Sequence, residues 1–198
     1  KDEFRRKYGD IDPIKLASNE NPLGCSPKSI ERVKKFLETC NRYPDSSGYK
    51  LRLKLADIYN LSVNNVIIGS GSEGIMSYIM RTFLHDDDKI ISSSNSFIGF
   101  RVLADASGYE SSWVPMDKYH YNLEAIAKMI DSQTKIIYLA NPDNPTGTYF
   151  NKIQFDRFMK KVPDRVLIIL DDNHNGEDVG DPERIRGWLQ ELHYEVDM

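Results

Sequence analysis

The sequence predicts an α/β protein with a mostly parallel sheet and helices on both faces. Short apolar runs rich in β-branched residues alternate along the chain with segments whose apolar residues recur at helical spacing. Strands that alternate with helices predict a parallel sheet, because each helix returns the chain across one face of the sheet. Three of the strand-like runs, residues 66–68, 136–140 and 166–170, are continuously apolar, which is typical of strands buried on both faces.

Each expected element follows from its own local pattern. Residues 1–13 are rich in charge and predict an arm or a frayed helix, and Ser26 followed by Pro27 is typical of a helix start. The expected helices cover residues 27–40, 49–59, 75–83, 101–108, 123–130 and 152–161. The expected strands cover residues 66–68, 89–92, 111–115, 136–140 and 166–170. We expect one sheet to contain the strands that end at Ile68, Ser92, Ala140 and Leu170.

Length and composition are those of an ordinary globular chain. It has 198 residues, a net charge of -4 and no long run of Lys or Arg, which argues against nucleic acid as a partner. No apolar run approaches the length of a membrane span, and no signal peptide precedes the charged start. Cys25 and Cys40 form no CxxC pair, so we expect neither a disulfide framework nor a metal site, and a reducing, cytoplasmic setting.

The strand expected at 136–140 ends abruptly in a turn, Asn-Pro-Asp-Asn-Pro-Thr-Gly, at residues 141–147. Ligands of open parallel sheets bind just beyond the carboxyl ends of the strands. Asn144 therefore stands where its amide can serve a ligand, on a turn stiffened by Pro142 and Pro145. Spacing alone leaves open a plain strand-to-helix connection.

A second candidate is the glycine-rich turn at residues 69–74, Gly-Ser-Gly-Ser-Glu-Gly, which precedes a helix. Free backbone N–H groups and the helix dipole make such a turn an anion site. The turn also matches the G-x-G-x-x-G pattern of dinucleotide-binding proteins. That alternative needs an acidic residue at the end of the next strand, and the run Asp86 to Asp88 lies before this strand instead.

A third candidate closes the most apolar run of the chain, residues 166–170. Asp171 follows this run directly, so its carboxylate is expected at the carboxyl end of a buried strand. A solvated loop aspartate is the alternative. We expect the strand ends to bring Ser72, Phe97, Asn144 and Asp171 around one pocket.

Together these motifs resemble those of the pyridoxal-phosphate aminotransferases of fold type I, and within them the histidinol-phosphate aminotransferase branch. The Asn-Pro-x-Asn-Pro-Thr-Gly pattern is specific, and the resemblance extends from about Ile14 to Asp172. It implies pyridoxal 5'-phosphate as cofactor and transamination between an amino-acid-like amine and a 2-oxo acid in histidine biosynthesis. It also implies a homodimer.

The resemblance implies roles for five residues of the candidate turns and strand ends. Gly71, Ser72 and Glu73 match the turn that holds the cofactor phosphate. Asn144 matches the residue that bonds the phenolic oxygen of the cofactor. Asp171 matches the carboxylate that keeps the ring nitrogen protonated, so that the ring accepts electrons from the substrate carbanion.

Three further positions match the family less closely. Phe97 matches an aromatic residue that lies flat on the cofactor ring, although Asn95 and Ser96 stand where the family commonly has Pro and Thr. Tyr43, in an Arg-Tyr-Pro-Asp segment, matches a tyrosine that reaches the phosphate of the partner subunit. Asn21 lies in a segment that resembles the substrate side of the entrance. The alternatives are a core residue at a helix start for Phe97, a packed surface ring for Tyr43 and part of an extended arm for Asn21.

The resemblance then stops. Asn173 and His174 stand where the family has Ala and Tyr, and no Lys follows Lys161. The lysine that bonds covalently to the cofactor in the family therefore has no match, so we assign no catalytic residue and expect the chain as given to be inactive alone. A non-catalytic binding relative of the fold is the main alternative, and a dinucleotide-dependent oxidoreductase the weaker one. The expected division is an arm at 1–27, a cofactor-binding portion at 28–172 and an atypical tail at 173–198.

Overall fold

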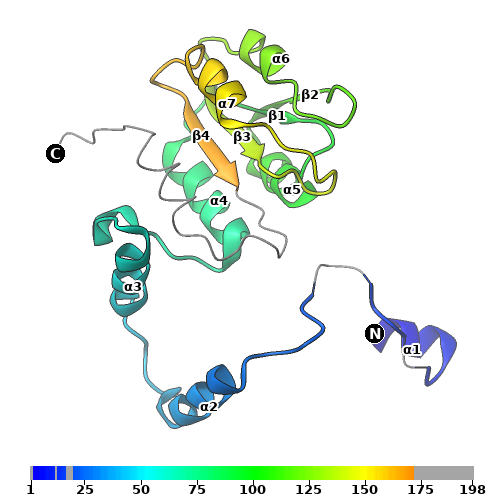
Figure 1. The fold of residues 1–198 in the computed structure, drawn as a ribbon, viewed down its shortest axis with the longest axis vertical. Coiled ribbons are helices and arrows are strands. Elements are labelled where there is room, and N and C mark those ends of the chain that lie inside the picture. Colours follow the sequence, from blue (N-terminus) through cyan, green and yellow to red (C-terminus); the bar gives the residue numbers. More distant parts are fainter. Residues whose placement is uncertain (1, 12, 17–19, 172–198) are drawn as a thin grey trace. The chain divides into compact units, whose positions relative to one another are not determined.

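The structure is a computed structural model that describes residues 2–11, 13–16 and 20–171 (Figure 1). The chain divides into two compact units, Lys1–Ser47 and Gly48–Met198. The tail expected at 173–198, with Asn173 and His174, lies outside the described residues. None of the helices in the described part is long and apolar enough to cross a membrane.

The first unit carries three short helical segments. These are α1 (Asp2–Tyr8), α2 (Pro27–Phe36) and the 3-10 helix η1 (Leu37–Thr39). Pro27 occupies the start of α2 as expected, but the Ser26 side chain forms no capping hydrogen bond. None of the three contains a buried residue. The apolar stripe of α2 therefore has no core within this unit.

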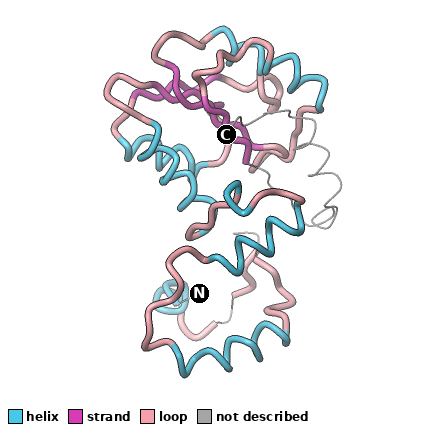
Figure 2. Tube along the Cα trace, turned by 90° about the vertical axis from the view of Figure 1, so that its left-hand side faces the viewer, coloured by secondary structure: helices cyan, strands magenta, loops and turns pink. Residues whose placement is uncertain are grey.

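The second unit is built on a four-stranded sheet with the strand order β2-β1-β3-β4. Figure 2 draws its strands in magenta. The strands are β1 (Lys89–Ser93), β2 (Glu110–Val114), β3 (Thr134–Ala140) and β4 (Leu167–Asp171). Every neighbouring pair is parallel. The expected parallel sheet is thus confirmed, with strand bounds close to those predicted from the sequence.

Helices cover both faces of the sheet (Figure 1). On one face lie α4 (Gly71–Phe83) and α5 (Ile98–Ser107), and on the other lie α6 (Leu123–Lys128) and α7 (Lys152–Met159). Alternate side chains of β3 enter the two layers: Ile136 and Tyr138 pack with α4 and α5, whereas Ile137 and Leu139 pack with α6 and α7. All four side chains are fully buried, which explains why the strand is apolar at every position.

One predicted strand is wrong. Residues 66–68 follow α3 (Tyr49–Tyr59) and the 3-10 helix η2 (Val63–Asn65), and no strand of the described residues pairs with them. Arg52 takes the place of a strand partner: its Nε donates to the Val66 carbonyl at 2.7 Å and its Nη2 to the Val63 carbonyl at 2.8 Å. The prediction failed because an apolar run of three residues specifies an extended backbone but not a neighbour.

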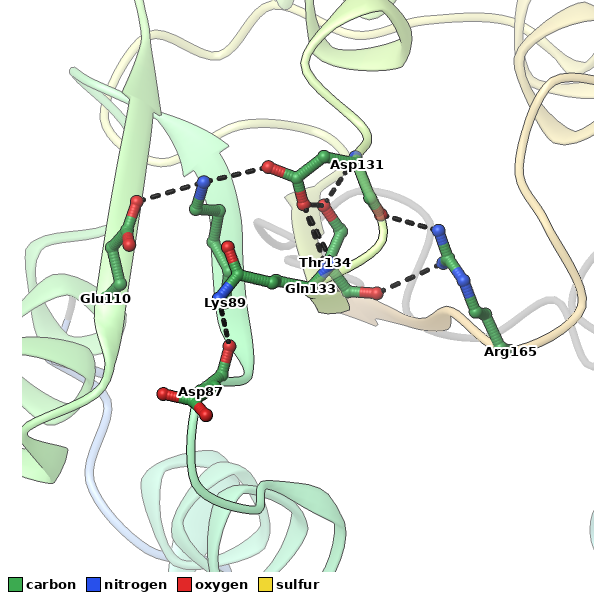
Figure 3. Close-up of polar contacts among 7 residues, drawn as sticks. All are labelled: Asp87, Lys89, Glu110, Asp131, Gln133, Thr134 and Arg165. Atoms are coloured by element: carbon green, nitrogen blue, oxygen red, sulfur yellow. Dashed lines mark hydrogen bonds and ion pairs between the residues drawn. The ribbon is translucent and has the colours of Figure 1, made fainter.

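Charged and polar groups tie the amino ends of the four strands together (Figure 3). At the start of β1, the Lys89 ammonium lies 2.9 Å from Glu110 on β2 and 2.9 Å from Asp131, which precedes β3. Asp131 Oδ1 accepts hydrogen bonds from the Thr134 backbone N–H and hydroxyl. Arg165, just before β4, donates to the Thr134 and Asp131 carbonyls.

This network, which we call the amino-end network, shifts the titration of its charged members. The hydrogen bond from Lys89, followed by that from Thr134, lowers the pKa of Asp131 to about 2. The hydrogen bonds to Asp131 and Glu110 raise the pKa of Lys89 above its usual value. Both shifts favour the ionised pair.

Candidate functional site

Three of the predicted site residues of the second unit follow the carboxyl ends of strands, whereas the glycine-rich turn at 69–74 follows no strand of the described residues. Phe97 caps α5 just after β1 ends, Asn144 lies in the turn after β3, and Asp171 ends β4. Because the strands are parallel, their carboxyl ends lie at one edge of the sheet. Ala140 pairs with Asp171 in register, so Asn144 and Asp171 extend from neighbouring strand ends.

The glycine-rich turn ends at the first residue of α4. Ser70 is the N-cap residue, yet its side chain makes no capping hydrogen bond. Gly71 has φ of +71°, which an L side chain rarely adopts, and no atom lies within 4 Å of the place where a Cβ would stand. The first turn of α4 thus keeps uncapped backbone N–H groups beside open space, a setting suited to an anion.

Gly99 brings the starts of α4 and α5 together. A Cβ on Gly99 would lie 2.6 Å from the Phe97 ring and 2.7 Å from the Glu73 carboxylate. Real Cβ atoms essentially never come so close, so a side chain at position 99 would force Phe97 and Glu73 to move. Gly99 thus lies beside both the predicted phosphate turn and the predicted ring-packing residue.

Asp171 has a partner that we did not predict from the sequence. The Tyr138 hydroxyl donates to Asp171 Oδ2 at 2.7 Å, and the Tyr138 ring stacks on Phe100 with ring centroids 3.9 Å apart. Burial, followed by the hydrogen bond to Asp171, raises the pKa of Tyr138 well above its usual value. Oδ1 of Asp171 has no hydrogen-bond partner among the described residues.

The turn that carries Asn144 is closed by a side chain at its start. The Asn141 amide donates to the Phe150 carbonyl at 3.2 Å, and its oxygen accepts the Phe150 N–H at 2.9 Å. The Asn141 N–H in turn donates to the Asp171 carbonyl at 2.9 Å. Asn144 is half-buried, and its amide has no hydrogen-bond partner in the part of the chain that the structure describes. The turn is thus held by Asn141 while Asn144 stays available.

A buried carboxylate lies inside the same turn. Asp143 is 1% exposed; its Oδ2 accepts hydrogen bonds from the Thr146 N–H and hydroxyl, while its Oδ1 is buried without a partner. Tyr121 lies close enough for the charge of Asp143 to affect it, and burial is the main cause that raises the pKa of Tyr121 to about 12. The Tyr121 hydroxyl donates to Ser96 and accepts the Ala140 N–H.

The two remaining predicted residues lie in the first unit. The Asn21 amide is engaged locally, since it accepts the Leu23 N–H at 3.0 Å and donates to the Gly24 carbonyl at 3.1 Å. The Tyr43 side chain is fully exposed within the described residues. Their roles at the site stay predictions.

Sequence reasoning missed Tyr138 and Asn141, which hold Asp171 and the turn in place. A signal for Tyr138 existed: a hydroxyl in a buried apolar run needs a hydrogen-bond partner. The identity of that partner depends on strand register, which the sequence does not specify. Asn141 had no comparable signal, because its partner Phe150 lies beyond the turn.

The fold is that of an α/β protein with polar groups at the carboxyl edge of a parallel sheet. Among the described residues, the start of α4 has no side-chain cap, and one oxygen of the Asp171 carboxylate has no hydrogen-bond partner. The chain belongs to the family of class I and II aminotransferases, whose model matches residues 11–194.

Individual relatives agree with this assignment. The chain is 38% identical over 173 residues to histidinol-phosphate aminotransferase 1 of Psychrobacter arcticus, covering 86% of this chain and 46% of that protein. It is 39% identical over 174 residues to histidinol-phosphate aminotransferase 2 of Pseudomonas aeruginosa, covering 86% of this chain and 47% of that protein. The chain therefore spans about half the length of the curated relatives it matches.

Solved structures share the fold. The histidinol-phosphate aminotransferase of Sinorhizobium meliloti, solved in complex with pyridoxal-5'-phosphate, matches with a TM-score of 0.78 and 23% identity. That match covers 85% of this chain and 46% of the other. The histidinol-phosphate aminotransferase of Clostridium acetobutylicum matches with a TM-score of 0.69 and 23% identity, over 88% of this chain and 51% of the other.

Proposed function

We propose that this chain is the cofactor-binding portion of a pyridoxal-phosphate-dependent aminotransferase. The observation that supports the proposal is that Phe97, Asn144 and Asp171 all follow the carboxyl ends of parallel strands. Glu73 and Phe97 both lie close to Gly99. Asp171 ends β4, which pairs with β3, and Asn144 lies in the turn after β3. An anion site, a ring surface, an amide and a carboxylate are the groups that a phosphorylated pyridine needs.

The chemistry of these groups fits that cofactor. Its phosphate suits the uncapped start of α4, where Gly71 leaves open space. Asp171 has one free carboxylate oxygen among the described residues, which suits a protonated ring nitrogen. When bound, pyridoxal phosphate supplies an electron sink for the carbon that loses its proton in transamination.

The residues of this chain would bind and tune that group. The N–H groups of Ser72 and Glu73 and the Ser72 hydroxyl hold the phosphate beside Gly71, whose own N–H donates to the Gly69 carbonyl at 3.0 Å. Phe97 packs against the ring. Asp171 keeps a proton on the ring nitrogen, and the Asn144 amide donates to the phenolic oxygen. We further propose residues 28–172 as the portion that forms this site, with the arm at 1–27 supplying Asn21 on the substrate side.

We propose a histidinol-phosphate-like amine as amino donor and a 2-oxo acid as acceptor. The support is the consistent naming of the relatives as histidinol-phosphate aminotransferases. In this family a lysine completes the chemistry, and no Lys follows Lys161 in this chain. We therefore expect the chain as given to bind the cofactor weakly and without a covalent bond, and to show no transamination.

Titration of the chain with pyridoxal 5'-phosphate, followed by absorbance and fluorescence, tests the proposal. We expect Asp171→Asn to weaken binding by about tenfold or more, because a charge-assisted hydrogen bond is lost. Asp164→Asn is the matched control, since this exposed carboxylate precedes the same strand, and it should leave the affinity unchanged. Equal affinities for all three proteins would contradict the proposed site.

Borohydride reduction and mass spectrometry should find no stoichiometrically modified lysine, and one such lysine would overturn the expected lack of a covalent bond.

We also propose a two-fold dimer in which Tyr43 serves the phosphate of the partner subunit. Two observations support it: Tyr43 is fully exposed, and the apolar stripe of α2 is uncovered, with Val33 at 61% and Phe36 at 52% exposure. Light scattering should give twice the monomer mass, and Val33→Asp should shift the chain towards monomer. A wild-type chain that stays monomeric at high concentration would count against the dimer.

A further inference from the structure

Tyr138 places a phenol hydroxyl in the middle of an apolar strand. It is fully buried, as are Ile136, Ile137 and Leu139 beside it on β3. Burial removes the hydrogen bonds that a hydroxyl makes to water, so phenylalanine would suit this position better unless the hydroxyl has a partner. The partner is Asp171 Oδ2, at 2.7 Å.

Building on the proposed function of Asp171, we infer that Tyr138 is a positioning residue for the cofactor ring. It holds the Asp171 carboxylate in one orientation, with Oδ2 engaged and Oδ1 left to bind a protonated ring nitrogen. Tyr138 acts through Asp171 and needs no contact of its own with the ligand.

Both members of the pair are anchored. The Tyr138 ring is nearly parallel to the Phe100 ring, with 9° between their planes, so the phenol cannot swing away without unstacking. The Asp171 backbone is fixed on the other side, because Ala140 pairs with it in register and the Asn141 N–H donates to its carbonyl. A hydrogen bond between two anchored groups fixes the carboxylate plane as well as its distance.

The direction of the hydrogen bond is also fixed. Burial and the neighbouring carboxylate raise the pKa of Tyr138, so the phenol keeps its proton across the neutral range and serves as donor. A neutral donor engages one carboxylate oxygen and leaves the negative charge of the group for the ring nitrogen. Without this donor, the carboxylate can rotate and its charge is no longer held at one place.

The test uses this chain, pyridoxal 5'-phosphate labelled with nitrogen-15 in the ring, and Tyr138→Phe. The variant keeps the stacked ring and removes only the hydroxyl. We expect the affinity to fall by about tenfold, as for the loss of one hydrogen bond to a charged group. We also expect the nitrogen-15 resonance of the bound ring to move towards that of unprotonated pyridine. A purely structural hydroxyl would change stability without moving this resonance.

Tyr109→Phe is the matched control. The Tyr109 hydroxyl donates to the Leu84 carbonyl at 3.2 Å, and its ring packs against the same core cluster as Tyr138. It is not a partner of Asp171, so its removal should change neither the affinity nor the ring resonance. In an Asp171→Asn background, Tyr138→Phe should add little, because the two residues act as a unit.

The possible outcomes distinguish the positioning role of Tyr138 from the proposed cofactor binding. If Tyr138→Phe matches wild type in both readouts while Asp171→Asn weakens binding, Tyr138 has no positioning role and the proposed function stands. If wild type does not bind the cofactor, or Asp171→Asn binds as wild type does, the proposed function is wrong and this inference falls with it. Should Tyr138→Phe fail to fold, carbon-13 tyrosine labelling of wild type decides: cofactor should shift the Tyr138 resonance but not that of Tyr109, and an unmoved Tyr138 overturns the inference.

Discussion

The two ends of the parallel sheet differ in how their polar groups are satisfied. At the amino ends, Lys89 forms ion pairs with both Glu110 and Asp131, and Arg165 donates to the carbonyls beside β3. At the carboxyl ends, the Asn144 amide and one oxygen of Asp171 have no partner within the described residues. One end of the sheet is thus self-contained, whereas the other keeps hydrogen-bonding capacity for a ligand.

The difference matters because charge alone does not mark the candidate site. The amino-end network holds more charged groups than the carboxyl edge does. Unsatisfied groups mark it, because a folded chain seldom leaves buried or half-buried polar atoms unpaired without a functional reason. Asp143 Oδ1, buried without a partner in the turn after β3, belongs to the same pattern.

The largest effect is expected in the turn after β3, where two asparagines differ in role. Asn141→Ala removes two hydrogen bonds to the backbone of Phe150, which is 4% exposed, and should lower the free energy of unfolding by about 2 kcal/mol. Asn144→Ala is the matched control and should leave this free energy nearly unchanged, while weakening cofactor binding by about tenfold. Urea denaturation and cofactor titration measure the two effects. Equal destabilisation by both variants would show that Asn141 and Asn144 do not differ in their roles in the turn.

A smaller effect is expected at the amino ends. Thr134 is 2% exposed, and its hydroxyl both donates to Asp131 Oδ1 and accepts the Asp131 N–H. Thr134→Val keeps the shape and should cost about 1 kcal/mol of stability, as for the loss of typical hydrogen bonds. Cofactor affinity should stay at the wild-type value. A variant that binds the cofactor more weakly at unchanged stability would show that the two ends are not independent.

The smallest effect concerns pH. The pKa of Asp131 falls from 3.8 to about 2 on folding, so its contribution is fully present above about pH 4 and is lost as the pH falls towards 2. The pKa of Lys89 is raised, so its contribution is present below 10.5 and is lost as the pH rises through the folded value. Exposure and salt keep both contributions small.

Denaturation midpoints measured from pH 5 to pH 2 check the acid side of this prediction. Asp131→Asn should flatten the profile relative to wild type, because the asparagine does not titrate. An identical profile for the variant would assign the acid sensitivity to other carboxylates.

Most of the fold could be predicted from the sequence, because its signals are local. Continuous apolar runs specified β1, β3 and β4, and helical spacing specified α3 to within its observed bounds, Tyr49–Tyr59. The strand predicted at residues 66–68 was wrong for the opposite reason, because strand pairing depends on a neighbouring strand. Arg52 donates hydrogen bonds to the carbonyls of Val66 and Val63 instead.

The residues of the candidate site could be predicted from the sequence, but the contacts that hold them in place could not. Turn chemistry and strand ends pointed to Asn144 and Asp171 without any knowledge of the sheet. The contact of Tyr138 with Asp171 depends on the register between β3 and β4, and the approach of Glu73 and Phe97 to Gly99 depends on how two helices pack. Such contacts are long-range, so no local pattern encodes them.

The glycine at position 99 makes neighbouring positions of this corner unequal in the substitutions they tolerate. A single added carbon at position 99 would lie within 2.7 Å of both Glu73 and Phe97, so these side chains would have to move. Its neighbour Ile98 is 67% exposed. Alanine at position 99 is therefore expected to disturb the corner between the starts of α4 and α5, whereas alanine at position 98 is not.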